Sequence, residues 1–326
     1  MIEYVYISNS YLKIWANYDK AFPLRISLEG DKGDFEVVLL ARRIYGENNL
    51  FEAYTPYGYG GPVLIKGGRD AVFPFEKFLN ELKRRNIVDV FIRFSPFLKN
   101  HKYFPENAIE LNRYTASRAL SKMSYNNVIK TLSKGTKWSI RKSANCGVDI
   151  SIVNGKDIRK TEIEEFYKLY SQNMKVVNAT NYYFLNTQCI KNHFVYLGDN
   201  IDLFVAKLDD KWIAASIFIK DERMCHYHLS ASNKRYSKFY PVDRIMFEAI
   251  VFYGNEGEKL LHLGGGLSLS EDDPLFNFKK KFGDTINEFY IGKLIVDNKL
   301  YRELRATKGI KNSKYFLIND ALERKL

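Results

Sequence analysis

The chain has few cysteines and no long apolar run, and both absences exclude classes of protein. Three cysteines occur among 326 residues, at Cys146, Cys189 and Cys225, without the spacing of a zinc site or a disulfide framework. No apolar stretch approaches the roughly 20 residues of a membrane helix, and the first residues lack a basic and then apolar leader. We therefore expect a cytoplasmic protein with reduced thiols and no integral membrane segment.

The signatures of several enzyme classes are also missing. The chain has no Gly-x-Ser-x-Gly elbow, no Cys-His signature, no phosphate loop and no Rossmann glycine spacing. His226 and His228 flank Tyr227 at a spacing that could chelate a metal, but no further ligand stands nearby. The sequence thus predicts no hydrolase nucleophile, no metal and no tightly bound cofactor.

Acidic residues are absent from one long segment. Residues 113–145 contain no Asp or Glu, although the whole chain has 38 of them. The basic residues of this segment are Arg113, Arg118, Lys122, Lys130, Lys134, Lys137, Arg141 and Lys142. They supply +8 of the net charge of +12. The segment is either a surface for phosphates of a nucleotide or of tRNA, or a solvated helix face.

Apolar periodicity predicts an α/β fold with mixed, largely antiparallel sheets flanked by helices. Strands are expected over 35–44, 50–54, 88–94, 108–111 and 148–153, and then over 202–208, 211–220, 223–230, 260–263 and 288–296. Helices are expected over 73–85, from a capping box at Thr161–Glu164, over 182–191, 242–253 and 275–282, and in a basic helix that ends at Cys146-Gly147. We expect two domains, 1–150 and 151–326.

Two glycine clusters could bring the backbone close to a ligand. The first contains Tyr57, Gly58 and Tyr59, whose rings offer flat faces with a hydroxyl tip. The second contains Gly264 and Gly265 at the end of an expected strand. For both clusters the alternative is an ordinary tight turn.

A lysine stands among aromatic residues in the segment Phe276–Gly283. Phe278 and Phe282 share a helix face, and Lys279 follows Phe278 directly. A lysine beside aromatic side chains can stabilise a developing oxyanion. The alternative is an amphipathic helix with exposed lysines.

Taken in order, these motifs resemble a known family. TPYGYGGP, FIRFSP, KWSIRKSANCGV, HYHLSAS, HLGGG and FNFKKKFG resemble the FemABX-like branch of the GNAT acyltransferase superfamily over about residues 35–295. The resemblance implies two tandem GNAT-like domains. It also implies transfer of an amino acid from aminoacyl-tRNA to an amine of a peptidoglycan precursor.

The resemblance also implies roles for individual residues. It assigns transition-state stabilisation to Lys279 beside Phe278, and a phosphate contact to Arg141 on the segment Lys137–Lys142. Tyr57–Gly61 and Arg93 map to the acceptor side, in the N-terminal domain. The coiled-coil arm of some members is missing, and Ser237–Pro241, which includes Tyr240, stands where other GNAT proteins carry a CoA pyrophosphate loop.

These observations predict an N-acyltransferase that delivers an aminoacyl or acyl group to an amine of an anionic, nucleotide-linked or lipid-linked envelope precursor. The oxyanion is assigned to Lys279 and to backbone N–H groups of residues 226–230, and the proton to His228 or Tyr227. Arg93, Lys137, Arg141, Tyr240, Gly264 and Gly265 complete the candidate contacts. The alternatives are an acyl-CoA-dependent N-acetyltransferase acting on an amino sugar and a non-catalytic RNA-binding protein.

Overall fold

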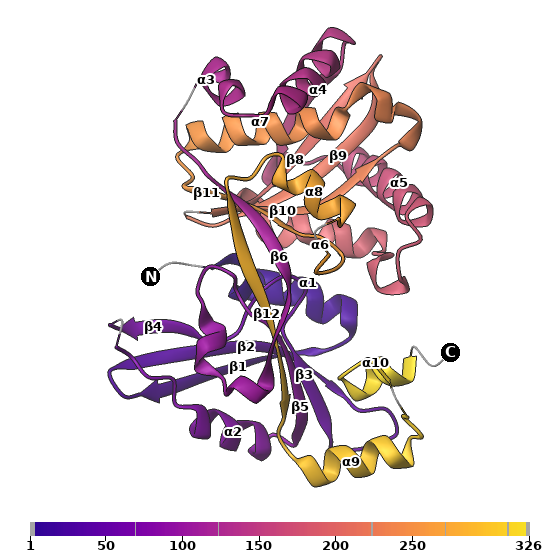
Figure 1. Cartoon of the computed structure of the whole chain (residues 1–326). Helices are drawn as coiled ribbons and strands as arrows, with labels where there is room; N and C mark the ends of the chain where they lie inside the picture. The colour runs from indigo at the N-terminus through magenta and orange to yellow at the C-terminus, as the bar shows by residue number, and fades with distance from the viewer. Residues whose placement is uncertain are drawn as a thin grey trace. The chain divides into compact units, whose positions relative to one another are not determined.

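The chain forms two compact α/β units (Figure 1). The structure, a computed structural model, describes residues 4–68, 70–122, 124–222, 224–270, 272–311 and 313–323. Unit 1 consists mainly of Tyr6–Arg113 and Glu288–Leu326. Unit 2 consists mainly of Tyr114–Asn287.

Beyond Tyr6 the chain passes between the units twice, and neither passage lies at the boundary predicted near residue 150. Strand β6 (Ile109–Ala119) begins in unit 1 and ends in unit 2, and β12 (Thr285–Ile295) leads back. In unit 1, β12 pairs with β5 (Ile87–Arg93) from Ile291 to Ile295. The observed division differs from the prediction because this long-range pairing leaves no signal in the local sequence pattern.

Unit 1 contains a mixed sheet in the order β1-β2-β3-β5-β12, with β4 paired to β2. Only β3 and β5 are parallel neighbours along this path. Its other elements are α1 (Asn9–Asp19), β1 (Phe22–Gly30), β2 (Gly33–Arg43), β3 (Phe51–Tyr54), β4 (Val63–Gly67), α2 (Phe75–Arg84), α9 (Asn298–Thr307) and α10 (Ile318–Glu323). Alternate residues of β1 and β2, among them Ile26 and Val37, form the apolar core that α2 covers with Phe78 and Leu82.

Unit 2 contains a sheet in the order β6-β11-β10-β9-β8-β7, in which only β10 and β11 are parallel neighbours. Its strands are β7 (Asp149–Asn154), β8 (Ile201–Leu208), β9 (Lys211–Lys220), β10 (Met224–Ser232) and β11 (Leu260–Gly265). Its helices are α3 (Tyr125–Lys130), α4 (Lys134–Asn145), α5 (Lys160–Val176), α6 (Thr187–Leu197), α7 (Pro241–Glu256) and α8 (Pro274–Lys280). Phe247 of α7 and Phe282 beyond α8 share a core with Cys225 and Tyr227 of β10, while α5 contacts β9 and β10 (Figure 1).

Most expected elements are confirmed, including the antiparallel meander β8-β9-β10 and the end of the basic helix at Cys146. Two helix starts were wrong. The N-cap of α5 is Arg159, whose N–H donates to Glu162, so Thr161 lies inside the helix. Residues 181–183 form a single 3₁₀ turn, and α6 begins at Thr187 because the Asn186 side chain caps it. Helices α1, α9 and α10 and strands β1 and β4 were missed.

The predicted class, tandem α/β units with mixed sheets, is confirmed. Among the described residues, no helix combines the length and the apolar composition needed to span a membrane.

Unit 1 buries an ionic network beneath α10. Nε of Arg42 donates to Glu52 at 2.6 Å, and Arg42 also pairs with Asp320 of α10. Asp89 lies opposite Glu52 in the parallel pair of β3 and β5, and both acids are fully buried. Within the described residues, neither carboxyl oxygen of Asp89 has a hydrogen-bond partner. Burial and the neighbouring Glu52 raise the pKa of Asp89 well above 3.8, so folding favours the protonated form of Asp89.

Replacing Asp89 with asparagine is expected to stabilise the protein increasingly as the pH rises. The folded chain retains the Asp89 proton, whereas the unfolded chain releases it above its ordinary pKa of 3.8, so the wild type loses stability as the pH increases toward the raised pKa. The difference in free energy of unfolding should grow by about 1.4 kcal/mol per pH unit above ~4. Denaturant titrations at several pH values measure it. Asp149→Asn, at an exposed position of β7, is the matched control; a difference for Asp89→Asn that stays constant with pH would contradict this.

Candidate functional site

The parallel strands β10 and β11 of unit 2 stop pairing partway along their length. Met224–His226 of β10 pair with Leu260–His262 of β11, and the register ends there, although β10 continues to Ser232 and β11 to Gly265. Each strand has an irregularity just beyond this point, between Tyr227 and Leu229 and between His262 and Gly264. The carboxyl ends of the two strands therefore carry backbone N–H and C=O groups that are not exchanged between them.

Lys279 of α8 lies at this point of divergence. Its Nζ donates a hydrogen bond to the carbonyl oxygen of Gly265 at 2.7 Å and lies 5.9 Å from the centroid of the Tyr227 ring. Phe278 is half-buried and packs on Phe282 at 5.6 Å between ring centroids. The structure thus brings together three predicted residues from three elements: Lys279, Tyr227 and Gly265.

Tyr227 carries a neutral phenol next to Lys279. Burial raises its pKa, although hydrogen bonds with the Ser230 and Ser216 side chains act in the opposite direction. A neutral phenol can donate one hydrogen bond and accept another. Tyr227 can therefore relay a proton or hold a polar group at this end of β10.

His228 faces away from this group. It follows Tyr227 on β10 and is buried, with its Nε2 3.2 Å from Nε2 of His193 on α6. Nδ1 of His193 lies 2.8 Å from the Cys189 carbonyl and must donate to it, so Nε2 of His193 accepts from His228. Burial, with His193 and His226 nearby, lowers the pKa of His228 well below 6.5. The structure does not bring His228 together with Lys279.

No group of three or more metal-ligating side chains is assembled in the described part of the chain. His226 instead lies against His262, with 3.2 Å between their Nδ1 atoms. Burial lowers the pKa of His226 to about 3. Both imidazoles are therefore neutral members of the buried sheet.

Sequence reasoning missed Asp273, which caps α8. Its side chain accepts from the N–H of Phe276 at 2.9 Å, and from that of Leu267 at 2.6 Å. An Asp directly before Pro274 at the first helical position is a recognisable start signal. That signal predicts the cap, whereas the bond to Leu267 depends on the fold.

A basic and aromatic surface covers α4 and the adjoining 3₁₀ helix Lys234–Phe239. Trp138 is 54% exposed and meets the Tyr240 ring edge-on at 5.4 Å. Nζ of Lys142 lies 4.8 Å from the centroid of Trp138 and 5.4 Å from that of Tyr240. Lys137 is half-buried and Arg141 exposed on the same helix. The structure thus joins Tyr240 to the predicted basic segment.

The N-terminus of α7 lies next to this surface and differs from the helix ends that bind phosphate. Tyr240 has a positive φ of 52°, and Pro241, which has no N–H, begins the helix. Asp243 in the first turn is buried and accepts a hydrogen bond from Ser139 of α4 at 2.8 Å. A missing donor and a buried acid both make this helix end a poor pyrophosphate site.

The aromatic glycine turn of unit 1 is tightly packed. The Tyr57 ring lies tilted against Trp15 with 5.0 Å between ring centroids, and the Tyr59 ring meets Tyr6 edge-on at 5.5 Å. Gly58 has a φ of 101°, and a Cβ there would lie 2.2 Å from the Tyr6 ring. Glycine is therefore required at position 58, because the Tyr6 ring leaves no room for a side chain there.

Arg93 stands beside this turn at the end of β5. Its backbone N–H donates to Thr55 Oγ1 at 2.9 Å, and its guanidinium lies 5.1 Å from the Phe91 centroid. The side chain is half-buried. The turn lies directly beside Arg93, because the Gly60 N–H donates a hydrogen bond to the Arg93 carbonyl oxygen at 2.7 Å.

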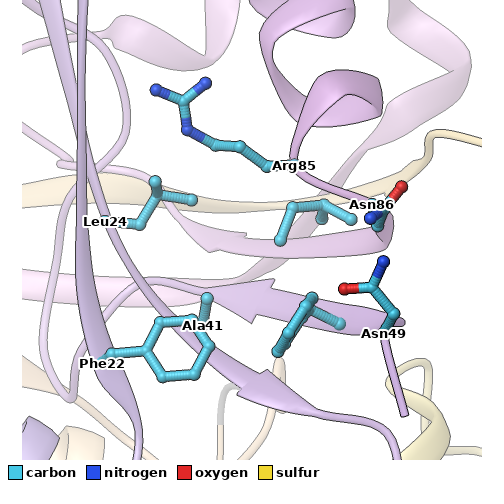
Figure 2. Close-up of a pocket in the computed structure, with 8 residues that line it drawn as sticks. Phe22, Leu24, Ala41, Asn49, Arg85 and Asn86 are labelled. Atoms are coloured by element: carbon cyan, nitrogen blue, oxygen red, sulfur yellow. The ribbon is translucent and has the colours of Figure 1, made fainter. Parts of the chain in front are cut away.

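Two pockets lie elsewhere. One of about 340 Å³ in unit 1 has an apolar floor that includes Phe22, Leu24 and Ala41, with Arg85, Asn49 and Asn86 at its rim (Figure 2). The other, of about 450 Å³, lies between α5 and the β8–β9 turn in unit 2 and includes Trp212 and Tyr236. Neither contains a predicted site residue.

Solved structures share this architecture. The crystal structure of FemX aligns with a TM-score of 0.68 over 93% of this chain and 94% of that chain, at 11% identity. The structure of L-PGS from Bacillus licheniformis aligns with a TM-score of 0.57 over 90% and 93%, at 11% identity. The fold is therefore that of FemX.

Sequence comparisons match two related family profiles. A profile described as peptidoglycan biosynthesis/recognition (FemAB-like) matches residues 115–228, and that of the FemAB family matches residues 199–306. Residues 115–306 of the chain are therefore similar to the FemAB family.

One curated relative shares part of its length with the chain. The UDP-N-acetylmuramoylpentapeptide-lysine N(6)-alanyltransferase of Weissella viridescens is 27% identical over 174 residues. The match covers 52% of this chain, and the chain spans about half of the relative, 49% of its length.

Proposed function

We propose that this protein transfers an aminoacyl group from aminoacyl-tRNA to an amine of a peptidoglycan precursor. The observation that carries the proposal is Lys279, held on the Gly265 carbonyl where β10 and β11 stop pairing, within the residues that match the FemAB family profile. The relative from Weissella viridescens is named for the transfer of alanine to a lysine of a UDP-linked muramoyl pentapeptide. We extend the same reaction class to this chain.

In the proposed reaction, the neutral amine attacks the ester carbonyl of the donor. A C–N bond forms, the C–O bond to the tRNA ribose breaks, and the amine proton passes to the leaving oxygen. The Lys279 ammonium and backbone N–H groups of β10 beyond its pairing with β11 would stabilise the oxyanion. Tyr227 would relay the proton, because its phenol is neutral and adjacent. We assign His228, buried against His193, to holding β10 in place.

The basic and aromatic surface of α4 would hold the tRNA donor. Lys137, Arg141 and Lys142 supply charge for phosphates, and exposed Trp138 offers a face for an unpaired base. Acyl-CoA is disfavoured as donor, since Pro241 and Asp243 leave the α7 terminus poorly suited to a pyrophosphate.

Charge reversal on α4 is expected to weaken the donor selectively. The double variant Lys137→Glu/Arg141→Glu should raise KM for aminoacyl-tRNA by about tenfold or more. The slope of log affinity against log salt should become shallower by about one for each phosphate that is no longer neutralised. KM for the acceptor should remain unchanged. Lys191→Glu, at an exposed position of α6, is the control, and an equal effect from it would show that net charge alone is responsible.

We place the acceptor on unit 1. Arg93 would contact a phosphate of the precursor, with Tyr57, Gly58 and Tyr59 beside it. Arg93 is half-exposed and has no ion-pair partner among the described residues, and its guanidinium donates to the Thr55 carbonyl oxygen at 3.4 Å. Arg93→Met should therefore raise KM for the acceptor.

The decisive experiment measures the intact mass of a UDP-linked muramoyl pentapeptide after incubation with the protein. One arm contains charged tRNA and the other acetyl-CoA. A mass gain of one amino acid, only with charged tRNA, is the expected result. A gain of one acetyl group would establish the acyl-CoA reaction instead. Salt-sensitive RNA binding without any product would favour the RNA-binding alternative.

A further inference from the structure

A single carboxylate joins the end of β11 to the start of α8. Oδ2 of Asp273 accepts hydrogen bonds from the N–H groups of Leu267 at 2.6 Å and Ser268 at 2.9 Å, and from the Ser268 hydroxyl at 3.2 Å. Oδ1 accepts from the N–H of Phe276 at 2.9 Å. The residue is only 5% exposed. Because four donors bind its two buried oxygens, the Asp273 carboxylate has a single orientation that satisfies all four hydrogen bonds.

Gly266 is packed directly on this carboxylate. A Cβ at Gly266 would lie 2.4 Å from Oδ1 and 2.7 Å from Oδ2 of Asp273, well inside van der Waals contact. Because four hydrogen bonds hold the carboxylate, it cannot move aside without breaking some of them. The last glycine after His262 therefore lets the backbone close over Asp273.

The hydrogen bonds also keep Asp273 ionised. Burial alone would raise its pKa, but the N–H groups of Phe276, Leu267 and Ser268 outweigh burial and lower the pKa below 3.8. Asp273 is therefore a carboxylate at neutral pH. A carboxylate accepts at both oxygens, whereas an asparagine amide would present a donor to one of the two sets of N–H groups.

Helix α8 depends on its ends for its orientation. It spans only Pro274–Lys280, about two turns, and helices of that length are unstable in isolation. Asp273 anchors its first turn, and Lys279 in its last turn returns to the Gly265 carbonyl at 2.7 Å. The segment from Gly265 to Lys279 is thereby closed at both ends.

We propose that Asp273 is a positioning residue for Lys279, acting through the loop after β11 and the first turn of α8. The closed segment keeps the Lys279 ammonium at the Gly265 carbonyl. The effect on turnover rests on the proposed function, in which Lys279 stabilises the oxyanion. The effect on the placement of Lys279 does not.

Amine labelling of the free protein tests the placement without any substrate. The rate at which an acylating reagent modifies Lys279 is measured by peptide mass spectrometry, with Lys280 on the same helix as internal reference. Asp273→Asn should raise the Lys279 rate relative to Lys280 by about two- to tenfold, the factor that corresponds to one hydrogen bond. Asp272→Asn, at the exposed neighbouring position, should leave the ratio unchanged. An unchanged ratio in Asp273→Asn would overturn the proposal.

Steady-state kinetics test the consequence for turnover. Asp273→Asn should lower kcat by about ten- to a hundredfold with little change in KM, since a small displacement of a reacting group costs that much. A decrease in kcat that merely follows the fraction of unfolded protein would overturn the proposal. Full turnover in a variant whose Lys279 labelling has increased would confirm the placement of Lys279 by Asp273 and overturn the effect on turnover.

Gly266→Ala provides a second variant in case Asp273→Asn does not fold. It should reproduce both effects, because its Cβ displaces the Asp273 carboxylate. Gly135→Ala on α4 is the matched control for the labelling ratio alone, since no atom lies within 4 Å of its added Cβ. A wild-type protein that transfers no group with any donor would refute the proposed function, while the labelling ratio still decides the placement of Lys279.

Discussion

Substituting methionine for Lys279 is expected to lower kcat by about 10²- to 10³-fold and to leave acceptor binding nearly unchanged. Methionine retains much of the length and apolar surface of the lysine stem but removes the ammonium. The ammonium lies at the Gly265 carbonyl, where β10 and β11 diverge and where the tetrahedral intermediate would form. Single-turnover rates with charged tRNA and a direct measurement of acceptor affinity distinguish the two quantities.

The matched control is the adjacent lysine. Lys280→Met alters the same short helix, but Nζ of Lys280 lies over the Phe276 ring instead of at Gly265. Its kcat should stay within about twofold of wild type. If Lys279→Met loses acceptor binding and keeps its turnover, Lys279 is a binding residue and the catalytic assignment fails.

Arg42→Met is expected to destabilise the protein by about 3–5 kcal/mol. Arg42 is the partner of fully buried Glu52 and of Asp320 in α10, and its removal leaves a buried carboxylate without its counter-charge. Lowering the pH should reduce the destabilisation, because Glu52 can then take up a proton. Denaturant unfolding at neutral and acid pH measures both effects.

A double variant distinguishes the loss of the Arg42–Glu52 ion pair from the loss of side-chain packing at Arg42. In Arg42→Met/Glu52→Gln the buried carboxylate is gone, so much of the stability should return, with a coupling energy of about 1–3 kcal/mol. Arg84→Met, which removes a 74%-exposed partner of Glu81, should cost less than about 1 kcal/mol. If Arg42→Met costs no more than Arg84→Met, the network does not hold α10 on the sheet.

Local sequence patterns predicted the elements around the site but not their association. The periodicity of 275–282 and the glycines after His262 were visible as a short helix and a strand end. The hydrogen bond from Lys279 to Gly265 spans 14 residues and is created by the fold. A resemblance of ordered motifs indicated that these pieces act together, which periodicity alone could not.

His228 illustrates the limit of strand alternation. Alternation correctly separates His228 from Tyr227, but it does not say which side of β10 faces Lys279. The structure shows Tyr227 in the core shared with α7 and α8, and His228 bonded to His193 of α6. Which helices cover which face depends on connections far along the chain.

The charge of the basic segment, most strands and helices, and the ordered motifs could be predicted from the sequence, because each depends on residues close together along the chain. Tertiary structure alone decided the return of β12 to unit 1, the buried pair of Glu52 and Asp89, and the closure of the Gly265–Lys279 segment by Asp273. These features join distant strands or exclude water from charged groups. Their energies arise only once the chain has folded, because burial and long-range pairing create them.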